Sequence, residues 1–234
     1  MITSQNKETQ ALVNDVREGR LLLPELQRQF VWKSTQVRDL FDSLYHNYPS
    51  GQILVWETDD LPYAHKVYLA DVAENDKHPH LLLDGQQRLT SLSAILLNRE
   101  LIVRGSKRPI DIVFNIHTEK FEVSGPRQSL DAGWISLTKL FNSGILSIIQ
   151  DLKLDIQSPQ TNGIFTRLTQ LDNIKTYKFQ VNILQDLTYE EVTHIFVRIN
   201  SGGTKLGSSD LALAQLSSRW RGITDEIERY RGEV

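Results

Sequence analysis

The hydrophobic positions of this sequence follow two periods, one typical of helices and one typical of strands. A period near 3.6 residues predicts a first helix from about Gln5 to Glu18, ended by Gly19, and a second helix with its N-cap at Ser34. The apolar stripe of the second helix consists of Val37, Leu40, Phe41, Leu44 and Tyr45. Further helices are predicted after Gly85, after the pair Ser158-Pro159, and after a capping box formed by Thr188 and Glu191.

Short apolar runs that are bounded by turn residues predict the strands. These runs are Leu21–Leu23, Gln52–Glu57, Val67–Ala70, Leu81–Leu83, Ile110–Ile116, Phe121–Val123 and Tyr177–Leu184. The run Leu81–Leu83 is apolar at every position, which predicts a central strand covered on both faces. From Ser136 onward the pattern is mainly helical, with a polar loop over Ser201–Gly207 and a last helix from about Ser209. The fold class is therefore α+β: a mixed sheet with helices, followed by a helix-rich C-terminal half.

The length and composition fit one folded domain. We expect a core over residues 1–135 and a mainly helical part over residues 136–234 that completes the same domain. The absence of cysteine excludes disulfides and thiolate metal sites. No signal peptide and no long apolar run is visible, so the expected location is the cytoplasm, without a membrane segment. A net charge of −3 means that DNA contact would need a local basic patch. The Arg104–Arg108 run is a candidate for that patch, although a short charge run is usually a solvated turn.

The segment Asp84-Gly85-Gln86-Gln87-Arg88 carries the strongest chemical signal, because it joins the apolar strand to a helix N-terminus. Unpaired N–H groups and the helix dipole favour an anion there, Gly85 permits close approach, and an arginine can grip a phosphate with two hydrogen bonds. Asp84 could hold a metal ion, orient water or lock Arg88. The alternative is structural: Asp84 caps the helix and pairs with Arg88. The pattern leaves these two interpretations equally open.

Two other polar segments follow or end apolar elements. Gln27 and Arg28 lie between a proline and the aromatic residue Trp32, where the aromatic ring could stack on a base and the arginine could meet phosphate. The alternative, an aromatic core residue beside a surface cation, is favoured when the segment is considered alone. Arg198 and Asn200 end a predicted helix before two glycines. An arginine that offsets the helix dipole and an asparagine C-cap would explain them as well.

Several familiar catalytic patterns are absent from the sequence. It has no G-x-x-x-x-G-K-[ST], no H-E-x-x-H and no G-x-S-x-G. The six histidines show no recognised ligand spacing. A P-loop NTPase, a zincin and a serine hydrolase of the nucleophile-elbow type are therefore excluded.

Taken in order, these three polar segments resemble one family. Pro24…Gln27-Arg28…Trp32, then Asp84-Gly85-Gln86-Gln87-Arg88, then Phe196-Val197-Arg198-Ile199-Asn200, are similar to the N-terminal domain of GmrSD-type restriction proteins, from about Leu21 to Leu216. The resemblance implies a ParB- or sulfiredoxin-like core within residues 1–135. It also implies binding and hydrolysis of an NTP with Mg²⁺, coupled to defence against modified foreign DNA.

The resemblance also implies roles for individual residues. Asp84, Gln86 and Gln87 would be catalytic, and Asp84 would also hold the metal ion. The nucleotide would be bound by Gln27, Arg28, Gly85, Arg88, Arg198 and Asn200. The family often adds an HNH nuclease domain, but no His-Asn-His pattern occurs in this sequence. A nuclease is therefore expected in a further domain or a separate subunit, and a homo-oligomer is a possible assembly.

Two alternatives to an NTPase remain open. The first is a binding module that recognises modified DNA and senses nucleotide without hydrolysing it. The second is a ParB-like nuclease, which is weaker because Asp84 is the only acid among the motif positions, whereas metal-assisted cleavage usually gathers several carboxylates.

Overall fold

The computed structural model describes residues 1–24, 30–58, 64–65, 80–103, 106, 108–155 and 158–201. In chain order the elements are β1 (Ile2–Glu8), α1 (Thr9–Arg17), β2 (Leu21–Pro24), α2 (Ser34–Tyr45), β3 (Ile53–Glu57), β4 (Ala64–His65), β5 (His80–Asp84), α3 (Gln86–Leu96), β6 (Ile112–Asn115), β7 (Phe121–Val123), β8 (Trp134–Ser136), α4 (Leu137–Asp151), α5 (Pro159–Asp172), β9 (Lys178–Leu184) and α6 (Tyr189–Ser201). Two short 3-10 helices, Gln128–Leu130 and Asn173–Thr176, complete the list. This content confirms the predicted α+β class.

The main sheet has the strand order β1-β9-β3-β5-β2-β4 and is mixed. β9 runs parallel to β3, β5 runs antiparallel to β3, and β2 runs parallel to β5. β5 therefore lies between two strands, as predicted for the apolar run Leu81–Leu83. Because of these directions, β5 and β2 end at the edge where β3 and β9 begin. We call this end of the main sheet the Asp84 edge.

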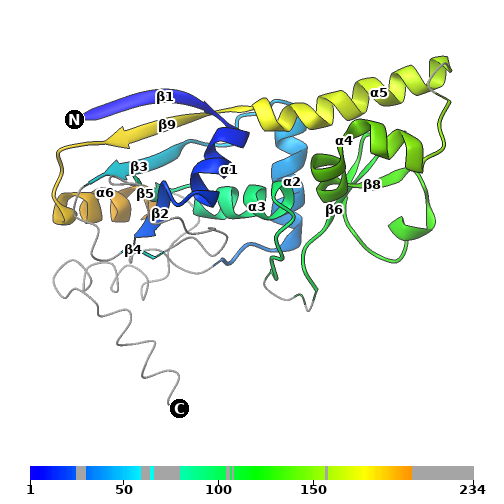
Figure 1. The fold of residues 1–234 in the computed structure, drawn as a ribbon. Coiled ribbons are helices and arrows are strands. Elements are labelled where there is room, and N and C mark those ends of the chain that lie inside the picture. Colours follow the sequence, from blue (N-terminus) through cyan, green and yellow to red (C-terminus); the bar gives the residue numbers. More distant parts are fainter. Residues whose placement is uncertain are drawn as a thin grey trace, which may run out of the picture.

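At β5 both faces of the main sheet are covered, which explains the unbroken apolar run of this strand. Leu82 points into the larger core, which includes buried residues of α1, α2 and α3. Leu81 and Leu83 point to the opposite face, where they join Val192 of α6 in a smaller core. Figure 1 shows α6 beneath the strands, with α1, α2 and α3 grouped beside them.

A three-stranded antiparallel sheet of order β7-β6-β8 lies with α4 and α5 on the other side of α2 (Figure 1). A polar network joins this part to α2. The hydroxyl of Tyr45 donates to Glu119 at 2.7 Å, and Arg167 of α5 pairs with the same carboxylate at 2.9 Å. Burial and the hydrogen bond to Glu119 raise the pKa of Tyr45, while the Tyr45 and Arg167 contacts lower the pKa of Glu119.

The N-terminal prediction was wrong in part. Gln5 to Glu8 belong to β1, and the helix begins at Thr9. β1 pairs with β9 at all seven positions, from Ile2↔Leu184 to Glu8↔Lys178, yet it is exposed on both faces. Backbone hydrogen bonds form such an edge strand without side-chain burial, so no alternating hydrophobic pattern marks it. The helix end at Gly19 is confirmed by its φ of +75°.

Other boundaries agree or differ slightly. The N-cap of α2 is Lys33 rather than Ser34. The capping box is confirmed, because Thr188 N–H donates to Glu191 at 2.8 Å and Glu191 N–H donates to the Thr188 hydroxyl at 3.4 Å. The predicted strand Val67–Ala70 and the helix from Ser209 lie outside the described residues, as does the loop after Ser201. None of the helices described is long and apolar enough to cross a membrane.

Candidate functional site

The turn from β5 into α3 places a carboxylate at the start of a helix. Asp84 is the last residue of β5, and its side chain is 41% exposed. Gly85 follows with a φ of +101°, and α3 begins at Gln86. The Gly85 N–H donates to Asp84 Oδ1 at 2.8 Å. A side chain at position 85 would be strained by this φ, and its Cβ would lie 2.4 Å from Ile53 Cδ1. Glycine is therefore required for this strand-to-helix turn.

Arg88 reaches back from the first turn of α3 and contacts three oxygen atoms. Its Nη1 donates to the Ser50 carbonyl at 2.7 Å, and its Nη2 donates to the Gln52 carbonyl at 2.7 Å. Nη2 also pairs with Asp84 Oδ2 at 3.1 Å. The side chain is only 14% exposed. The predicted pairing of Asp84 with Arg88 is present, whereas Asp84 does not cap the helix, because the N-cap is Gly85 and no side chain caps this end.

The turn that supplies these carbonyl groups is fitted closely to the guanidinium group. Gly51 has a φ of +83°, and a Cβ built there would lie 1.8 Å from Arg88 Nη1. No side chain larger than hydrogen fits unless Arg88 moves. This turn lies between α2 and β3, and its contact with Arg88 was not predicted from the sequence. Its partners are main-chain carbonyl groups, which every residue type supplies, so only the Pro-Ser-Gly turn signal was visible in the sequence.

Gln87 connects the motif to Val31 and Trp32, which lie just before α2. Its Oε1 accepts hydrogen bonds from the N–H groups of Val31, at 2.8 Å, and Trp32, at 3.2 Å. The neighbouring Gln86 is buried. Two of the three polar segments thus meet: the residues that directly follow positions 25–29 are held at the first turn of α3. Gln27 and Arg28 themselves lie outside the described residues.

The third segment reaches the same end of the sheet from the opposite face. After β9, α6 turns back and packs on the sheet through Val192, and Figure 1 shows it returning beneath β3 and β5. A 13-residue helix is about 20 Å long, as are the six residue steps of β9. The end of α6, with the exposed Arg198, therefore lies toward the Asp84 edge. Asn200 belongs to this helix, but its side chain lies outside the description.

The described residues contain no group of three or more His, Asp or Glu side chains that could hold a metal ion. In the described part of the chain, Asp84 therefore belongs to no larger cluster of such side chains. This carboxylate fits Mg²⁺ that arrives with a nucleotide, because Mg²⁺ is usually held by one or two carboxylates together with substrate phosphates.

The comparison with known proteins identifies the family. Residues 9–217 match the family described as the N-terminal domain of the GmrSD restriction endonuclease. The chain belongs to this family. It is also similar to the uncharacterized protein MJ0686 of Methanocaldococcus jannaschii, with 28% identity over 278 residues, covering 100% of this chain and 47% of the relative. The chain thus spans about half the length of that relative.

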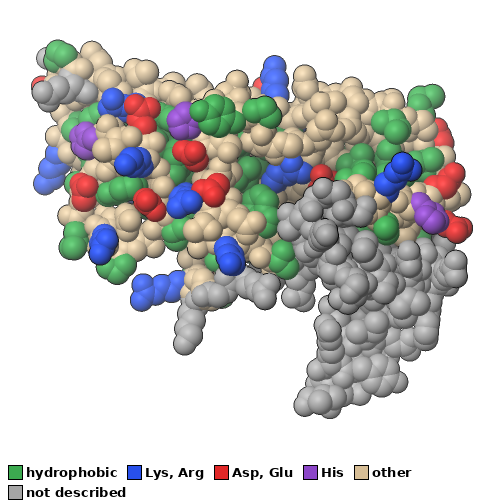
Figure 2. Space-filling model, turned by 180° about the vertical axis from the view of Figure 1, so that it is seen from behind, with side chains coloured by type: hydrophobic (Ala, Val, Ile, Leu, Met, Phe, Trp, Pro, Cys, Tyr) green, Lys and Arg blue, Asp and Glu red, His purple; other side chains and the backbone are tan. Residues whose placement is uncertain are grey.

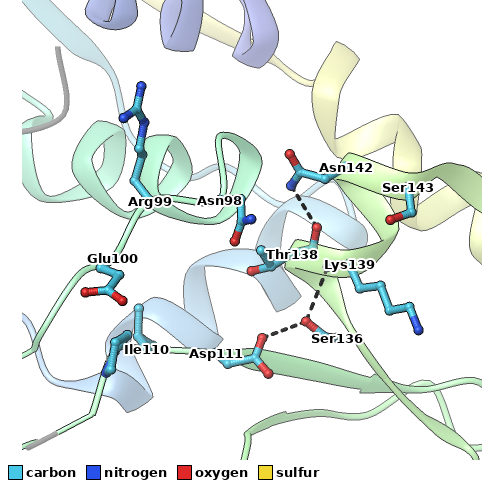
Figure 3. Close-up of a pocket in the computed structure, with 11 residues that line it drawn as sticks. Asn98, Arg99, Glu100, Ile110, Asp111, Ser136, Thr138, Lys139, Asn142 and Ser143 are labelled. Atoms are coloured by element: carbon cyan, nitrogen blue, oxygen red, sulfur yellow. Dashed lines mark hydrogen bonds between the residues drawn. The ribbon is translucent and has the colours of Figure 1, made fainter. Parts of the chain in front are cut away.

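Outside the Asp84 edge, the GmrSD domain has a polar cleft of about 490 Å³ between the end of α3, the start of β6 and the start of α4 (Figure 3). Asp111 lies in it and accepts a hydrogen bond from the Ser136 hydroxyl at 2.7 Å. Lys139, at the rim, pairs with Asp151 instead. Burial raises the pKa of Asp111, against the effect of hydrogen bonds from Ser136 and Ser124.

The surface of the GmrSD domain shows no basic face in the view of Figure 2, where basic and acidic side chains of the described residues are interspersed. In the candidate Arg104–Arg108 patch only Ser106 and Arg108 are described; Arg108 is exposed, and its carbonyl accepts from the Ser106 hydroxyl at 2.8 Å. The patch remains a prediction.

Proposed function

We propose that this GmrSD domain binds and hydrolyses a nucleoside triphosphate with Mg²⁺ at the Asp84 edge. One observation carries the proposal. The central strand β5 ends in the half-exposed carboxylate of Asp84, and Gly85, with its φ in the left-handed region, leads the chain directly into the N-terminus of α3. This combination suits a phosphate chain with its cation, since the helix end favours the anion and the carboxylate favours the metal.

Asp84 is the residue that we assign to the hydrolytic step. Its Oδ1 is fixed by the Gly85 N–H and its Oδ2 by Arg88, so the carboxylate has a defined orientation while remaining accessible. A carboxylate held in this way can orient the attacking water and accept its proton. The bound Mg²⁺ would neutralise charge on the phosphates, with Asp84 as its ligand from the protein. Gln86 is a second candidate for orienting water.

The remaining predicted ligands would complete the site from its two sides. Gln27 and Arg28 follow β2, which ends at the Asp84 edge beside β5. Arg198 and Asn200 come from the end of α6 on the opposite face of the sheet. Residues from both faces can meet a ligand only beyond the strand ends. We therefore propose that the nucleotide lies outside the edge rather than on either face.

The whole protein's role is proposed from its family. We expect the hydrolysis of nucleotide to control a restriction activity against modified DNA, with the nuclease in another domain or subunit of HNH type. The relative that covers this whole chain is about twice as long. A family member can therefore hold a further domain beside this one.

A second candidate function, nucleotide sensing without hydrolysis by a module that recognises modified DNA, is favoured by one specific contact. The Oε1 atom of Gln87 already accepts two backbone N–H groups. This glutamine oxygen is therefore engaged in holding Val31 and Trp32 rather than free to position water. Asp84 and Gln86 are then the two predicted catalytic residues that remain as candidates for positioning water.

The substitution Asp84→Asn tests the proposal, with Asp151→Asn as the matched control. Both aspartates are partly exposed, at 41% and 49%, and each pairs with one basic side chain. We expect Asp84→Asn to lower the hydrolysis rate at least about 100-fold, the usual scale for losing a general base. Asp151→Asn should leave hydrolysis unchanged. Phosphate release with each of the four NTPs and Mg²⁺ measures the rate, and calorimetry measures binding.

The two candidate functions give different results in this experiment. If wild-type protein binds an NTP but neither it nor the variants release phosphate, the sensing module is correct. If Asp84→Asn loses binding and hydrolysis equally, Asp84 is a ligand and not the catalytic base. No binding of any NTP by the folded wild-type chain would contradict both candidates.

A further inference from the structure

The turn over residues 48–52 is held from two sides by side chains that are far apart in the sequence. On one side Arg88 donates to the carbonyl groups of Ser50 and Gln52. On the other side, the Tyr177 hydroxyl donates to the Tyr48 carbonyl at 3.0 Å and accepts from the Ser50 N–H at 3.2 Å. Ser50 is thus bonded through its N–H to Tyr177 and through its carbonyl to Arg88.

Tyr177 is itself fixed, so it can act as an anchor. Its ring packs edge-on against Phe179, with centroids 4.9 Å apart, and its carbonyl accepts from both the N–H and the hydroxyl of Thr9, at 2.9 and 3.1 Å. A cleft of about 680 Å³ lies beside Tyr177 and Pro49. Beside this cleft, the hydrogen bonds of the Tyr177 hydroxyl are contacts that hold the turn.

The hydrogen bonds from Tyr177 continue, through Ser50 and Arg88, to the carboxylate of the proposed nucleotide site. Tyr177 bonds to Ser50, Ser50 to Arg88, and Arg88 to Asp84. The guanidinium group can hold both carbonyl groups and the carboxylate at once because its donors form a planar fork. A lysine keeps the charge but presents no fork. A phosphate group, in contrast, can be bound by the positive charge of either an arginine or a lysine.

We propose, on the basis of the nucleotide site proposed above, that Arg88 and Tyr177 are positioning residues. They clamp the 48–52 turn between them, and this clamp orients the Asp84 carboxylate. Arg88 then acts on hydrolysis through Asp84 and not as a ligand of the phosphates. The turn forms the wall of the site beside Arg88, and Tyr177 controls that wall from outside the site.

Three variants of the full chain test the clamp: Arg88→Lys, Arg88→Met and Tyr177→Phe. Arg88→Lys should lower kcat about tenfold or more, nearly as much as Arg88→Met, because neither side chain can bridge the two carbonyl groups. Tyr177→Phe removes two hydrogen bonds and keeps the ring, so kcat should fall about three- to tenfold. The Kd for the Mg²⁺–NTP complex should change less than about threefold in Arg88→Lys and Tyr177→Phe, since the phosphates are not contacted.

Tyr45→Phe is the matched control. It also removes a hydroxyl from a packed tyrosine, but that hydroxyl bonds to Glu119, away from the turn. It should leave kcat unchanged. The clamp is wrong if Arg88→Lys keeps the wild-type kcat while Arg88→Met loses nucleotide binding, because that pair of results makes Arg88 a phosphate ligand.

Hydrogen exchange at the Ser50 amide tests the clamp without any nucleotide. Tyr177→Phe should speed this exchange about tenfold, because it removes the acceptor of that N–H, whereas Tyr45→Phe should not. If wild-type protein proves not to bind or hydrolyse any NTP, the proposed function fails, and the exchange result alone judges the clamp. Unchanged exchange at Ser50 in Tyr177→Phe would show that the turn is not held by Tyr177.

Discussion

The close fit between Gly51 and Arg88 can be tested by adding one methyl group at position 51 and measuring the loss of stability. We expect Gly51→Ala to destabilise the protein through two separate effects. A non-glycine residue at a φ of +83° costs about 1–2 kcal/mol. The new Cβ, 1.8 Å from Nη1, also forces the guanidinium group away from the Ser50 carbonyl. A hydrogen bond to a charged group is worth about 1.5–3 kcal/mol, and this one is largely shielded from water, so the combined loss should be about 3–4 kcal/mol.

A double-mutant cycle with Arg88→Met separates the two effects. Methionine keeps the aliphatic stem but has no Nη1 atom for the methyl group to meet. In that background Gly51→Ala should cost only the backbone term, about 1–2 kcal/mol. The coupling energy between the two positions is therefore expected to be about 1.5–3 kcal/mol. Urea unfolding, followed by tryptophan fluorescence, gives all four free energies. Equal costs of Gly51→Ala in both backgrounds would refute the close fit of this turn around the guanidinium group.

Two further predictions concern the carboxyl group of Asp111 and the cleavage of DNA. Burial raises the pKa of Asp111 in the folded state, so its favourable contribution is present below the unfolded pKa and is lost as pH rises through the folded pKa. Asp111→Asn should therefore gain stability relative to wild type between about pH 4 and pH 7, and parallel unfolding curves over this range would contradict it. The isolated chain should not cut plain or modified plasmid with Mg²⁺ or Mn²⁺ and NTP, because the described residues hold no cluster of metal-binding side chains. Cleavage that is abolished by Asp84→Ala would contradict the proposal that the nuclease lies in another domain or subunit.

The sequence predicts the central part of the fold well because burial there is two-sided. The run Leu81–Leu83 is apolar at each position, and the structure covers it with helices on both faces. The capping box of α6 is equally visible, because side chains make its hydrogen bonds. β1 escaped prediction for the opposite reason: an exposed edge strand is formed by main-chain pairing with β9, and its side chains carry no alternating pattern.

The same distinction applies to the candidate site. The sequence identifies Asp84, Gly85 and Arg88 together, because their contribution depends on residue type. It leaves the role of Arg88 open between phosphate and carboxylate, because both need the same donors. The proposed positioning role rests on contacts with the carbonyl groups of Ser50 and Gln52, which lie 38 and 36 positions earlier in the chain. A pattern of residue types cannot reveal acceptors that belong to the main chain.

This arrangement also explains which positions of the site can vary. Ser50 and Gln52 contact Arg88 through their carbonyl groups, so their side chains are not required for that contact. Gly51 is strongly favoured, because a side chain there would be strained at a φ of +83° and its Cβ would displace Nη1. Arg88 is required, because no other side chain presents two parallel donors to the turn and a further one to Asp84. The turn therefore fixes one glycine and one arginine, and the carboxylate that these two residues orient is the group on which hydrolysis would depend.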